Sequence, residues 1–239
     1  MRILITNDDG INAPILPRFV EWAKRLGEVT VVAPKFEQSG NSQAIDFRRA
    51  VEIKRVDFPV ECEAWAMDSS PADCVRFGVT GLGRRYDIVL SGINHGYNLG
   101  DDISYSGTVG AIMEAARLDH RAIAFSTDID TFEFAMAELD HVYQTICERD
   151  LFAHARLLNV NFPMQKSRGV LITKQGGEFY SDAFEYKGND TYLQVGYPID
   201  DAGDDLSLDI AAVRAGYVSV TPLTEERTDW VAYEKLRER

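Results

Sequence analysis

Short apolar segments alternate with amphipathic segments as far as about residue 162, and this alternation restricts the possible folds more than any other feature. The apolar segments have the length and branched residues of buried strands, and the intervening segments repeat apolar residues at helical spacing. Because strands that alternate with helices form parallel sheets, we predict an α/β fold with a doubly wound, mainly parallel sheet. The predicted strands are 2–6, 29–33, 87–90, 122–125 and 157–162, and the predicted helices are 15–26, 72–79, 107–118 and 132–148.

A hairpin is predicted in the second part of the chain. After one more strand at 170–174, residues 176–197 are rich in glycine and tyrosine, with a turn at 187–190 between two β-like arms. An isolated hairpin cannot bury its aromatic side chains. We therefore interpret this one as an oligomerisation element.

The change in character divides the chain into two regions. Residues 1–165 are predicted to form the catalytic core. Residues 166–239 are predicted to form a C-terminal extension, with the hairpin arm and a terminal helix from about Thr228, that completes the core and the oligomer interface. The acidic run at 200–205 is interpreted as a solvated loop.

Composition excludes several classes of partner. With a net charge of −13, the chain has no basic field that would attract a nucleic acid polymer or an anionic membrane. The three cysteines, Cys62, Cys74 and Cys147, lack the spacing of a metal site or redox motif, so we expect reduced thiols. The sequence contains no recognisable signal peptide and no apolar run long enough to cross a membrane. The expected location is the cytoplasm.

Two adjacent aspartates, Asp8 and Asp9, follow the first predicted strand directly. In open α/β sheets the ligand crevice lies at the carboxyl ends of the strands, so both carboxylates are expected there. Crowded carboxylates repel each other, so either one is protonated or a cation lies between them. Ser39 follows the second strand and Asn94 the third, which places their oxygens at the same edge. These four residues suit a six-coordinate Mg²⁺ or Mn²⁺ completed by waters.

Each of these residues also has a simpler interpretation. An Asn-Asp-Asp-Gly string after a strand is often only a turn, Ser39 beside Gly40 fits an ordinary loop, and Asn94 can brace a turn. Their shared position at strand ends is what favours the metal. His95, next to Asn94, is either a proton shuttle or, as we favour, a loop histidine facing solvent.

A second set of residues surrounds the start of the helix predicted from Gly107. Small and hydroxyl-bearing residues leave backbone N–H groups free at a helix N-terminus, where the dipole adds partial positive charge. We predict a phosphate site formed by Asn98, Ser106, Gly107 and Thr108. The alternative is an ordinary N-cap. The segment is neither a P-loop nor a dinucleotide fingerprint.

Six motifs, in order along the chain, support a resemblance to one family. They lie at 6–10, 37–40, 71–75, 91–94, 105–109 and 216–223. Together they resemble the signatures of the SurE family of metal-dependent 5′/3′-nucleotidases, also called survival protein E. The resemblance spans nearly the whole chain. It implies a Rossmann-like core with a swapped C-terminal arm, a homodimer or homotetramer, and one divalent ion per subunit held by Asp8, Asp9, Ser39 and Asn94.

The resemblance also implies a reaction. Its members hydrolyse nucleoside 5′- or 3′-monophosphates, and some trim short polyphosphate. A metal-bound water would attack the phosphoryl group, with Asp8 or Asp9 orienting or deprotonating it. Departures from the family pattern at 48–49, 69–73 and 119–121 involve none of the predicted ligands and leave the preferred base and sugar open.

Two other hypotheses remain for the aspartate pair. One is a phosphatase that forms an aspartyl-phosphate intermediate, although such enzymes usually space their aspartates one residue apart. The other is a non-catalytic nucleotide or Mg²⁺ sensor that signals through the C-terminal arm.

Overall fold

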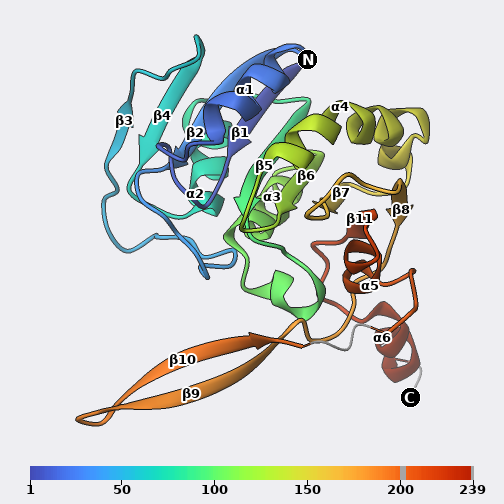
Figure 1. Cartoon of the computed structure of the whole chain (residues 1–239). Helices are drawn as coiled ribbons and strands as arrows, with labels where there is room; N and C mark the ends of the chain where they lie inside the picture. Colours follow the sequence, from blue (N-terminus) through green and yellow to red (C-terminus); the bar gives the residue numbers. More distant parts are fainter. Residues whose placement is uncertain (200–202, 238–239) are drawn as a thin grey trace.

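The computed structural model describes residues 1–199 and 203–237 (Figure 1). Each predicted strand and helix has a counterpart among them. The elements are β1 (Arg2–Thr6), α1 (Leu16–Lys24), β2 (Glu28–Pro34), β3 (Ile53–Arg55), β4 (Glu63–Met67), α2 (Pro71–Arg76), the π-helical turn η1 (Phe77–Gly81), β5 (Ile88–His95), the 3-10 helix η2 (Gly100–Ser104), α3 (Gly107–Arg117), β6 (Ala122–Thr127), α4 (Glu133–Glu148), the 3-10 helix η3 (Leu151–Ala153), β7 (Leu157–Asn161), β8 (Val170–Ile172), β9 (Tyr180–Gly188), β10 (Thr191–Pro198), α5 (Asp209–Arg214), β11 (Val218–Leu223) and α6 (Trp230–Arg237).

The main sheet has nine strands in the order β3-β4-β2-β1-β5-β6-β7-β11-β8. Neighbours from β4 to β7 are parallel, whereas β3 pairs with β4, and β11 with β7, in antiparallel fashion. The predicted fold class is therefore confirmed. The chain builds outward from β1 through β2 to β4, and then continues on the other side of β1 with β5. The boundary between β1 and β5 is thus a topological switch point, where open α/β sheets bind ligands.

Helices cover both faces of the sheet (Figure 1). Ile3 and Ile5 of β1 join the cluster beneath α1 and α4, whereas Leu4 joins the cluster beneath α2 and α3. Because successive side chains of a strand point to opposite faces, a strand buried on both sides must be apolar throughout. This requirement explains the continuous apolar runs in the sequence.

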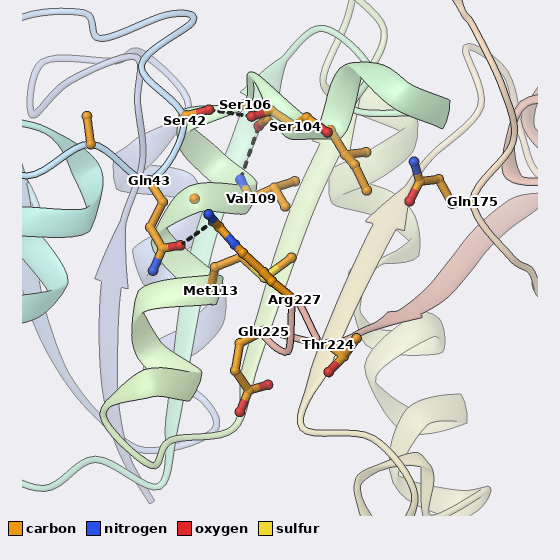
Figure 2. A pocket seen from close by; sticks show the side chains of 13 residues that line it. Ser42, Gln43, Ser104, Ser106, Val109, Met113, Gln175, Thr224, Glu225 and Arg227 are labelled. Carbon is orange, nitrogen blue, oxygen red and sulfur yellow. Dashed lines mark hydrogen bonds between the residues drawn. The ribbon is translucent and has the colours of Figure 1, made fainter. Parts of the chain in front are cut away.

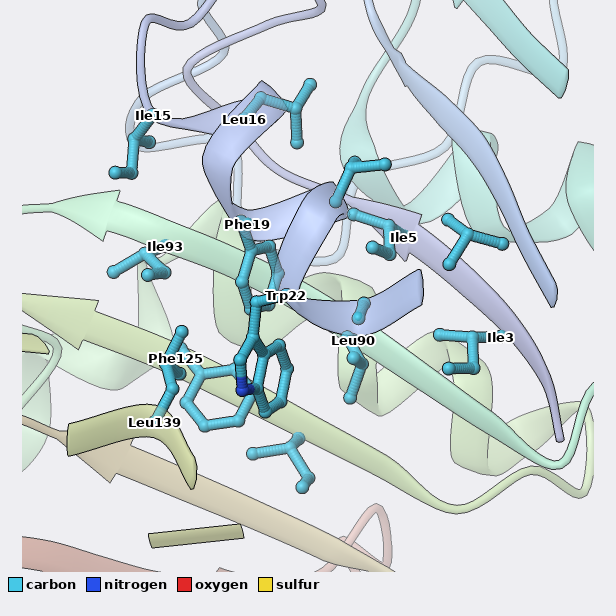
Figure 3. Close-up of a cluster of buried hydrophobic side chains, with 14 of the residues drawn as sticks. Ile3, Ile5, Ile15, Leu16, Phe19, Trp22, Leu90, Ile93, Phe125 and Leu139 are labelled. Carbon is cyan, nitrogen blue, oxygen red and sulfur yellow. The ribbon is translucent and has the colours of Figure 1, made fainter. Parts of the chain in front are cut away.

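Aromatic side chains fill the centre of the first cluster (Figure 3). Phe19 and Trp22 of α1 stack with ring centroids 5.5 Å apart. Phe125 of β6 meets both rings edge-on, and Phe162 stacks on Phe125 with ring centroids 6.1 Å apart. The cluster thus ties α1 to strands that are distant in the sequence.

Several elements were not predicted. The edge strand β3 is only three residues long, and in β4 buried and half-buried residues alternate instead of forming an apolar run. Proline usually interrupts a strand, but Pro222 lies within β11, near its end and opposite Leu158 of β7. Helix α5 is likewise new, and the helix predicted at 72–79 changes from α- to π-helical geometry after Arg76.

The hairpin forms a second, two-stranded sheet of β9 and β10 that projects from the body (Figure 1). Its turn places Asn189 and Asp190 at φ of 52° and 57°, the left-handed geometry that tight hairpins favour, at the predicted position. Its large exposed apolar and aromatic side chains are Tyr180, Phe184, Tyr186, Tyr192, Leu193 and Tyr197.

The rest of the C-terminal region returns to the main sheet. It contributes β8 and β11 beyond β7, and it ends in α6, which exposes Trp230, Val231 and Leu236. Of the acidic run, residues 200–202 lie outside the described residues, whereas Asp204 and Asp205 are exposed. Among the helices described, none is both long and apolar enough to cross a membrane.

Candidate active site

A short loop after β1 presents the aspartate pair at the switch point. The Asn7 side-chain amide bonds to both backbone polar groups of Gly10. Its Nδ2 donates to the Gly10 carbonyl at 2.9 Å, and its Oδ1 accepts from the Gly10 N–H at 3.1 Å. Gly10 has a φ of +96°, which side chains rarely permit. The sequence Asn-Asp-Asp-Gly therefore does form a turn, and this turn directs Asp8 and Asp9 to the carboxyl end of the sheet.

Asp8 is buried and held by the first turn of α3. Its carboxylate accepts hydrogen bonds from the Thr108 hydroxyl at 2.5 Å and from the Thr108 backbone N–H at 3.2 Å. Burial raises the pKa of Asp8, and the bonds from Thr108 partly oppose this shift. Gly107 makes the approach possible, because a Cβ there would lie 2.9 Å from the Asp8 Cβ. The Asp8 carbonyl accepts from the Gln38 N–H at 2.7 Å, which brings the Ser39 loop to the same edge.

Asp9 has an unpaired oxygen. Its Oδ2 is buried without a hydrogen-bond partner in the described part of the chain. Burial and the charge of Asp8 raise the Asp9 pKa to about 6, although the backbone N–H of His95 lowers it. A buried carboxylate oxygen without a donor is costly unless a proton or a cation compensates it. This orphaned oxygen is the structural observation that best fits a metal.

The two predicted neutral ligands come from the two segments that flank β1, one from β5 and one from the loop after β2. Asn94, in β5, donates from Nδ2 to the Gly96 carbonyl at 2.8 Å, an orientation that leaves Oδ1 available as a ligand. Ser39, in the exposed loop after β2, donates to a Glu37 carboxylate oxygen at 2.7 Å and keeps its lone pairs. In the described residues no three His, Cys, Asp or Glu side chains form a metal-binding group. A metal here would therefore be held by two carboxylates and neutral oxygens, the donor set of a hard divalent cation.

The start of α3 differs in part from its prediction. Ser106 is the N-cap, and its Oγ accepts from the Val109 N–H at 3.1 Å (Figure 2). The Thr108 hydroxyl, predicted to face a phosphate, instead donates to Asp8. The Gly107 N–H has no hydrogen-bond partner in the described structure, which makes it the available anion donor of this turn.

Asn98 lies in a buried polar cluster at the ends of β6 and β7. Its carbonyl accepts from Asn159 and Asn161 at 2.9 Å, its N–H donates to Asn161 at 2.9 Å, and its Nδ2 donates to Ser126 at 2.7 Å. Sequence reasoning did not single out Asn159 and Asn161. The available signal was their presence in an otherwise apolar strand, where buried amides require partners.

The His95 side chain turns away from the aspartates. Its ring stacks on Phe132 at 5.1 Å, and Nε2 is hydrogen-bonded to the Ile129 carbonyl. The residue is exposed, in agreement with the favoured interpretation. Its backbone N–H and its charge both lower the Asp9 pKa, but the ring nitrogen Nε2 is bonded to Ile129, so the geometry gives no support to a proton shuttle.

A cavity of about 630 Å³ lies beside the first turns of α3 (Figure 2). Ser106 and Val109 line it, and Arg227 crosses it to bond with Gln43 at 3.3 Å. None of the four predicted metal ligands is among its lining residues. Its volume therefore does not mark the chemical site, which is defined by the carboxylates at the switch point.

In the metal-free protein, the contribution of Asp9 to the free energy of unfolding is expected to fall as the pH rises from about 4 to above 6. The folded-state pKa of Asp9, about 6, lies above its usual value of 3.8, so the folded protein retains a proton that the unfolded chain has released. The stabilising contribution is complete below pH 3.8, declines through this window and is lost above about pH 6. Urea unfolding in chelator at several pH values measures it.

Asp9→Asn is the control for this pH effect, because it removes the carboxylate. Its free energy of unfolding relative to wild type is expected to increase by on the order of 1 kcal/mol between pH 4 and 7. If the difference in free energy of unfolding between the variant and wild type does not change with pH, a raised Asp9 pKa would be contradicted.

Comparisons with known proteins agree on one family. The family model described as survival protein SurE matches residues 3–182. The 5′-nucleotidase SurE of Natranaerobius thermophilus is 38% identical, with 99% of this chain and 97% of the relative covered. The 5′-nucleotidase SurE 1 of Thermus thermophilus is 40% identical, with 95% and 93% covered. The crystal structure of the SurE protein from Aquifex aeolicus, 32% identical, superposes with a TM-score of 0.82 over 100% of this chain and 99% of that one.

Proposed function

The chain belongs to the SurE family, and on this premise we propose that it is a 5′-nucleotidase, a metal-dependent phosphatase that converts nucleoside 5′-monophosphates to nucleoside and phosphate. The names of its relatives support the reaction. The unpaired Asp9 oxygen beside the buried Asp8 carboxylate carries the proposal of a metal.

Asp8, Asp9, Ser39 and Asn94 would hold one Mg²⁺ or Mn²⁺ ion. When bound, such an ion polarises a phosphoryl oxygen and lowers the pKa of a coordinated water. The two carboxylates balance its charge, and the bonds from Thr108 keep Asp8 in place without metal. Asp8 is therefore ordered before binding, which reduces the cost of positioning this ligand.

The remaining residues orient the phosphate and move a proton. The Gly107 N–H and the N-terminal dipole of α3 hold a non-bridging oxygen, with the Asn98 amide and the Ser106 hydroxyl as further donors. Water would attack the phosphorus in line with the leaving 5′-oxygen, whose bond to phosphorus breaks and which takes up a proton from solvent to give the nucleoside. Asp9 would accept the proton of the attacking water, because both Asp8 oxygens already accept hydrogen bonds from Thr108.

Phosphate release from purified protein tests this function. Nucleoside 5′- and 3′-monophosphates and short polyphosphate should each be assayed with Mn²⁺, Mg²⁺ and chelator. We expect turnover of 5′-monophosphates that chelator abolishes, with 3′-monophosphates and polyphosphate as further substrates. Absence of turnover with every ion would favour the nucleotide or Mg²⁺ sensor. A phosphorylated Asp8 or Asp9 trapped from labelled substrate would favour the covalent route.

Thr108→Val is expected to reduce activity roughly 10- to 100-fold, because Thr108 orients a metal ligand. It should also lower the free energy of unfolding by about 1–3 kcal/mol, since a buried Asp8 oxygen loses its donor. Steady-state kinetics and urea unfolding measure the two effects. Thr108→Ser retains the hydroxyl and should approach wild-type values. Equal losses in both variants would assign the effect to packing.

The hairpin supports a homodimer or homotetramer as the working form. Its aromatic side chains stay exposed even though Tyr186 and Tyr192 contact each other and Tyr197 bonds to Glu185, and exposed patches of this kind mark interfaces. A Phe184→Ser/Tyr186→Ser variant should lower the mass measured by light scattering, whereas Phe47→Ser, at a residue 76% exposed elsewhere, should not. A monomeric wild type would contradict the proposed oligomer.

The free thiols Cys62, Cys74 and Cys147 support a cytoplasmic location.

A further inference from the structure

A second cavity, of about 260 Å³, lies beyond the carboxyl end of β7, toward the base of the hairpin. Tyr97 and Leu99, the neighbours of Asn98 in the chain, form one wall, and Met164 lies in the loop that follows β7. Phe179, at the base of the hairpin, and Arg214, at the end of α5, complete it. Ligand pockets usually measure about 300–1,000 Å³, so this one suits a flat fragment of a ligand more than a whole nucleotide.

The lining has the chemistry that recognises a heteroaromatic ring. The Tyr97 and Phe179 rings meet edge-on with centroids 6.3 Å apart. The Arg214 guanidinium lies 5.4 Å from the centroid of the Phe179 ring. Aromatic and guanidinium faces stack on any nucleobase, whatever the arrangement of its hydrogen-bond donors and acceptors. The exposed Met164 and Arg214 stand at the rim, whereas Leu99 and Phe179 are buried.

The cavity is rigidly connected to the phosphate site. The half-buried Tyr97 ring packs edge-on against Phe179, and this contact orients it in the cavity wall. Asn98, between Tyr97 and Leu99, is held by Asn159, Asn161 and Ser126. Anything bound at the Asn98 amide therefore has a fixed relation to the Tyr97 ring.

The sheet order sets the distance along the carboxyl edge. The aspartates follow β1 and the cavity lies beyond the end of β7, three strand positions away. Because neighbouring strands lie about 4.8 Å apart, the aspartates and the cavity are roughly 14 Å apart. Asn98 lies between them, bonded to Ser126 of β6 and Asn159 of β7. A ligand with an anionic end near Gly107 and an aromatic end in the cavity would lie along this edge.

We propose that this cavity is the nucleobase subsite of the enzyme, and that Tyr97 is its specificity-determining residue. This inference rests on the proposed function and deepens it. The base provides binding energy that is the same in the ground state and the transition state, so losing the ring raises KM and leaves kcat nearly unchanged.

The kinetic test compares a substrate that carries a nucleobase with one that lacks it. Tyr97→Leu keeps apolar bulk but removes the aromatic face. It should raise KM for nucleoside 5′-monophosphates roughly 5- to 100-fold, while kcat/KM for ribose 5-phosphate changes less than twofold. Tyr97→Phe keeps the ring and should restore KM. A parallel loss on ribose 5-phosphate, or no change on either substrate, would overturn the proposal.

A binding test separates this proposal from the proposed function. Free adenosine and guanosine are titrated into wild type, Tyr97→Leu and the control Phe47→Ala, with binding followed by calorimetry. Nucleoside binding that Tyr97→Leu weakens and Phe47→Ala preserves supports the subsite even if no phosphate is released. If wild type hydrolyses 5′-monophosphates but binds nucleosides no better than Tyr97→Leu does, the proposed function is supported and the proposed subsite is contradicted.

Discussion

Asp9→Asn is expected to abolish metal-dependent phosphate release, with a loss in kcat/KM of at least roughly 100-fold. Changing only a hydrogen-bond partner of a metal ligand costs about 10- to 100-fold. The substitution removes both a proposed ligand and the proposed base, so the loss should exceed that range. Steady-state kinetics with Mn²⁺ and a nucleoside 5′-monophosphate measure it. A variant that keeps more than a tenth of wild-type activity would contradict the assignment.

The Asp9→Asn variant should lose activity without losing its fold. Because the substitution removes a negative charge beside the buried Asp8, the metal-free variant at pH 7 should be at least as stable as wild type. Saturating Mn²⁺ should raise the melting temperature of wild type, since a ligand that binds only the folded state stabilises it, and this rise should be absent in the variant. Asp101→Asn, at an exposed carboxylate beyond Asn98, is the matched control and should leave both readouts unchanged.

Phe125→Ala is expected to have the largest effect on stability, about 3–5 kcal/mol. Phe125 is fully buried and contacts the rings of Phe19, Trp22 and Phe162, so its removal leaves a cavity that the stacked rings cannot easily fill. For a chain of this size each kcal/mol corresponds to about 2–4 °C in melting temperature, so a fall of roughly 6–20 °C is expected.

Urea unfolding of Phe125→Ala should show a lower midpoint with an unchanged slope, because the loss is one of stability and not of compactness. Phe36→Ala is the control, since Phe36 is 62% exposed and surface changes usually stay within about 0.5 kcal/mol. A cost below 1 kcal/mol for Phe125→Ala would mean that the aromatic cluster is not the centre of the core.

The parts of this molecule that the sequence predicts well are those with a local cause. The apolar runs of β1 and β5 predict strands because both faces must be buried, and the strand ends then place Asp8, Asp9 and Asn94 at the switch point. The hairpin turn is predicted because Gly188, Asn189 and the residues around them favour left-handed geometry.

The parts that the sequence does not predict depend on distant partners. The Thr108 hydroxyl bonds to Asp8 because α3 packs against the loop after β1, and no local pattern distinguishes this bond from an N-cap. Asn159 and Asn161 are explained only by the Asn98 backbone that they hold. Strand β11 forms despite Pro222 because β7 and β8 supply its pairing.

The position of β11 between β7 and β8 has a consequence for synthesis of the protein. Every residue of β7 is buried, yet the strand that completes its outer edge comes from residues 218–223, near the end of the chain. While the ribosome is still translating that segment, β7 offers unpaired backbone groups to any passing strand, and such edges promote aggregation. A nascent chain stalled before residue 218, although it already carries Asp8, Asp9, Ser39 and Asn94, would therefore be a client for chaperones and not a working enzyme.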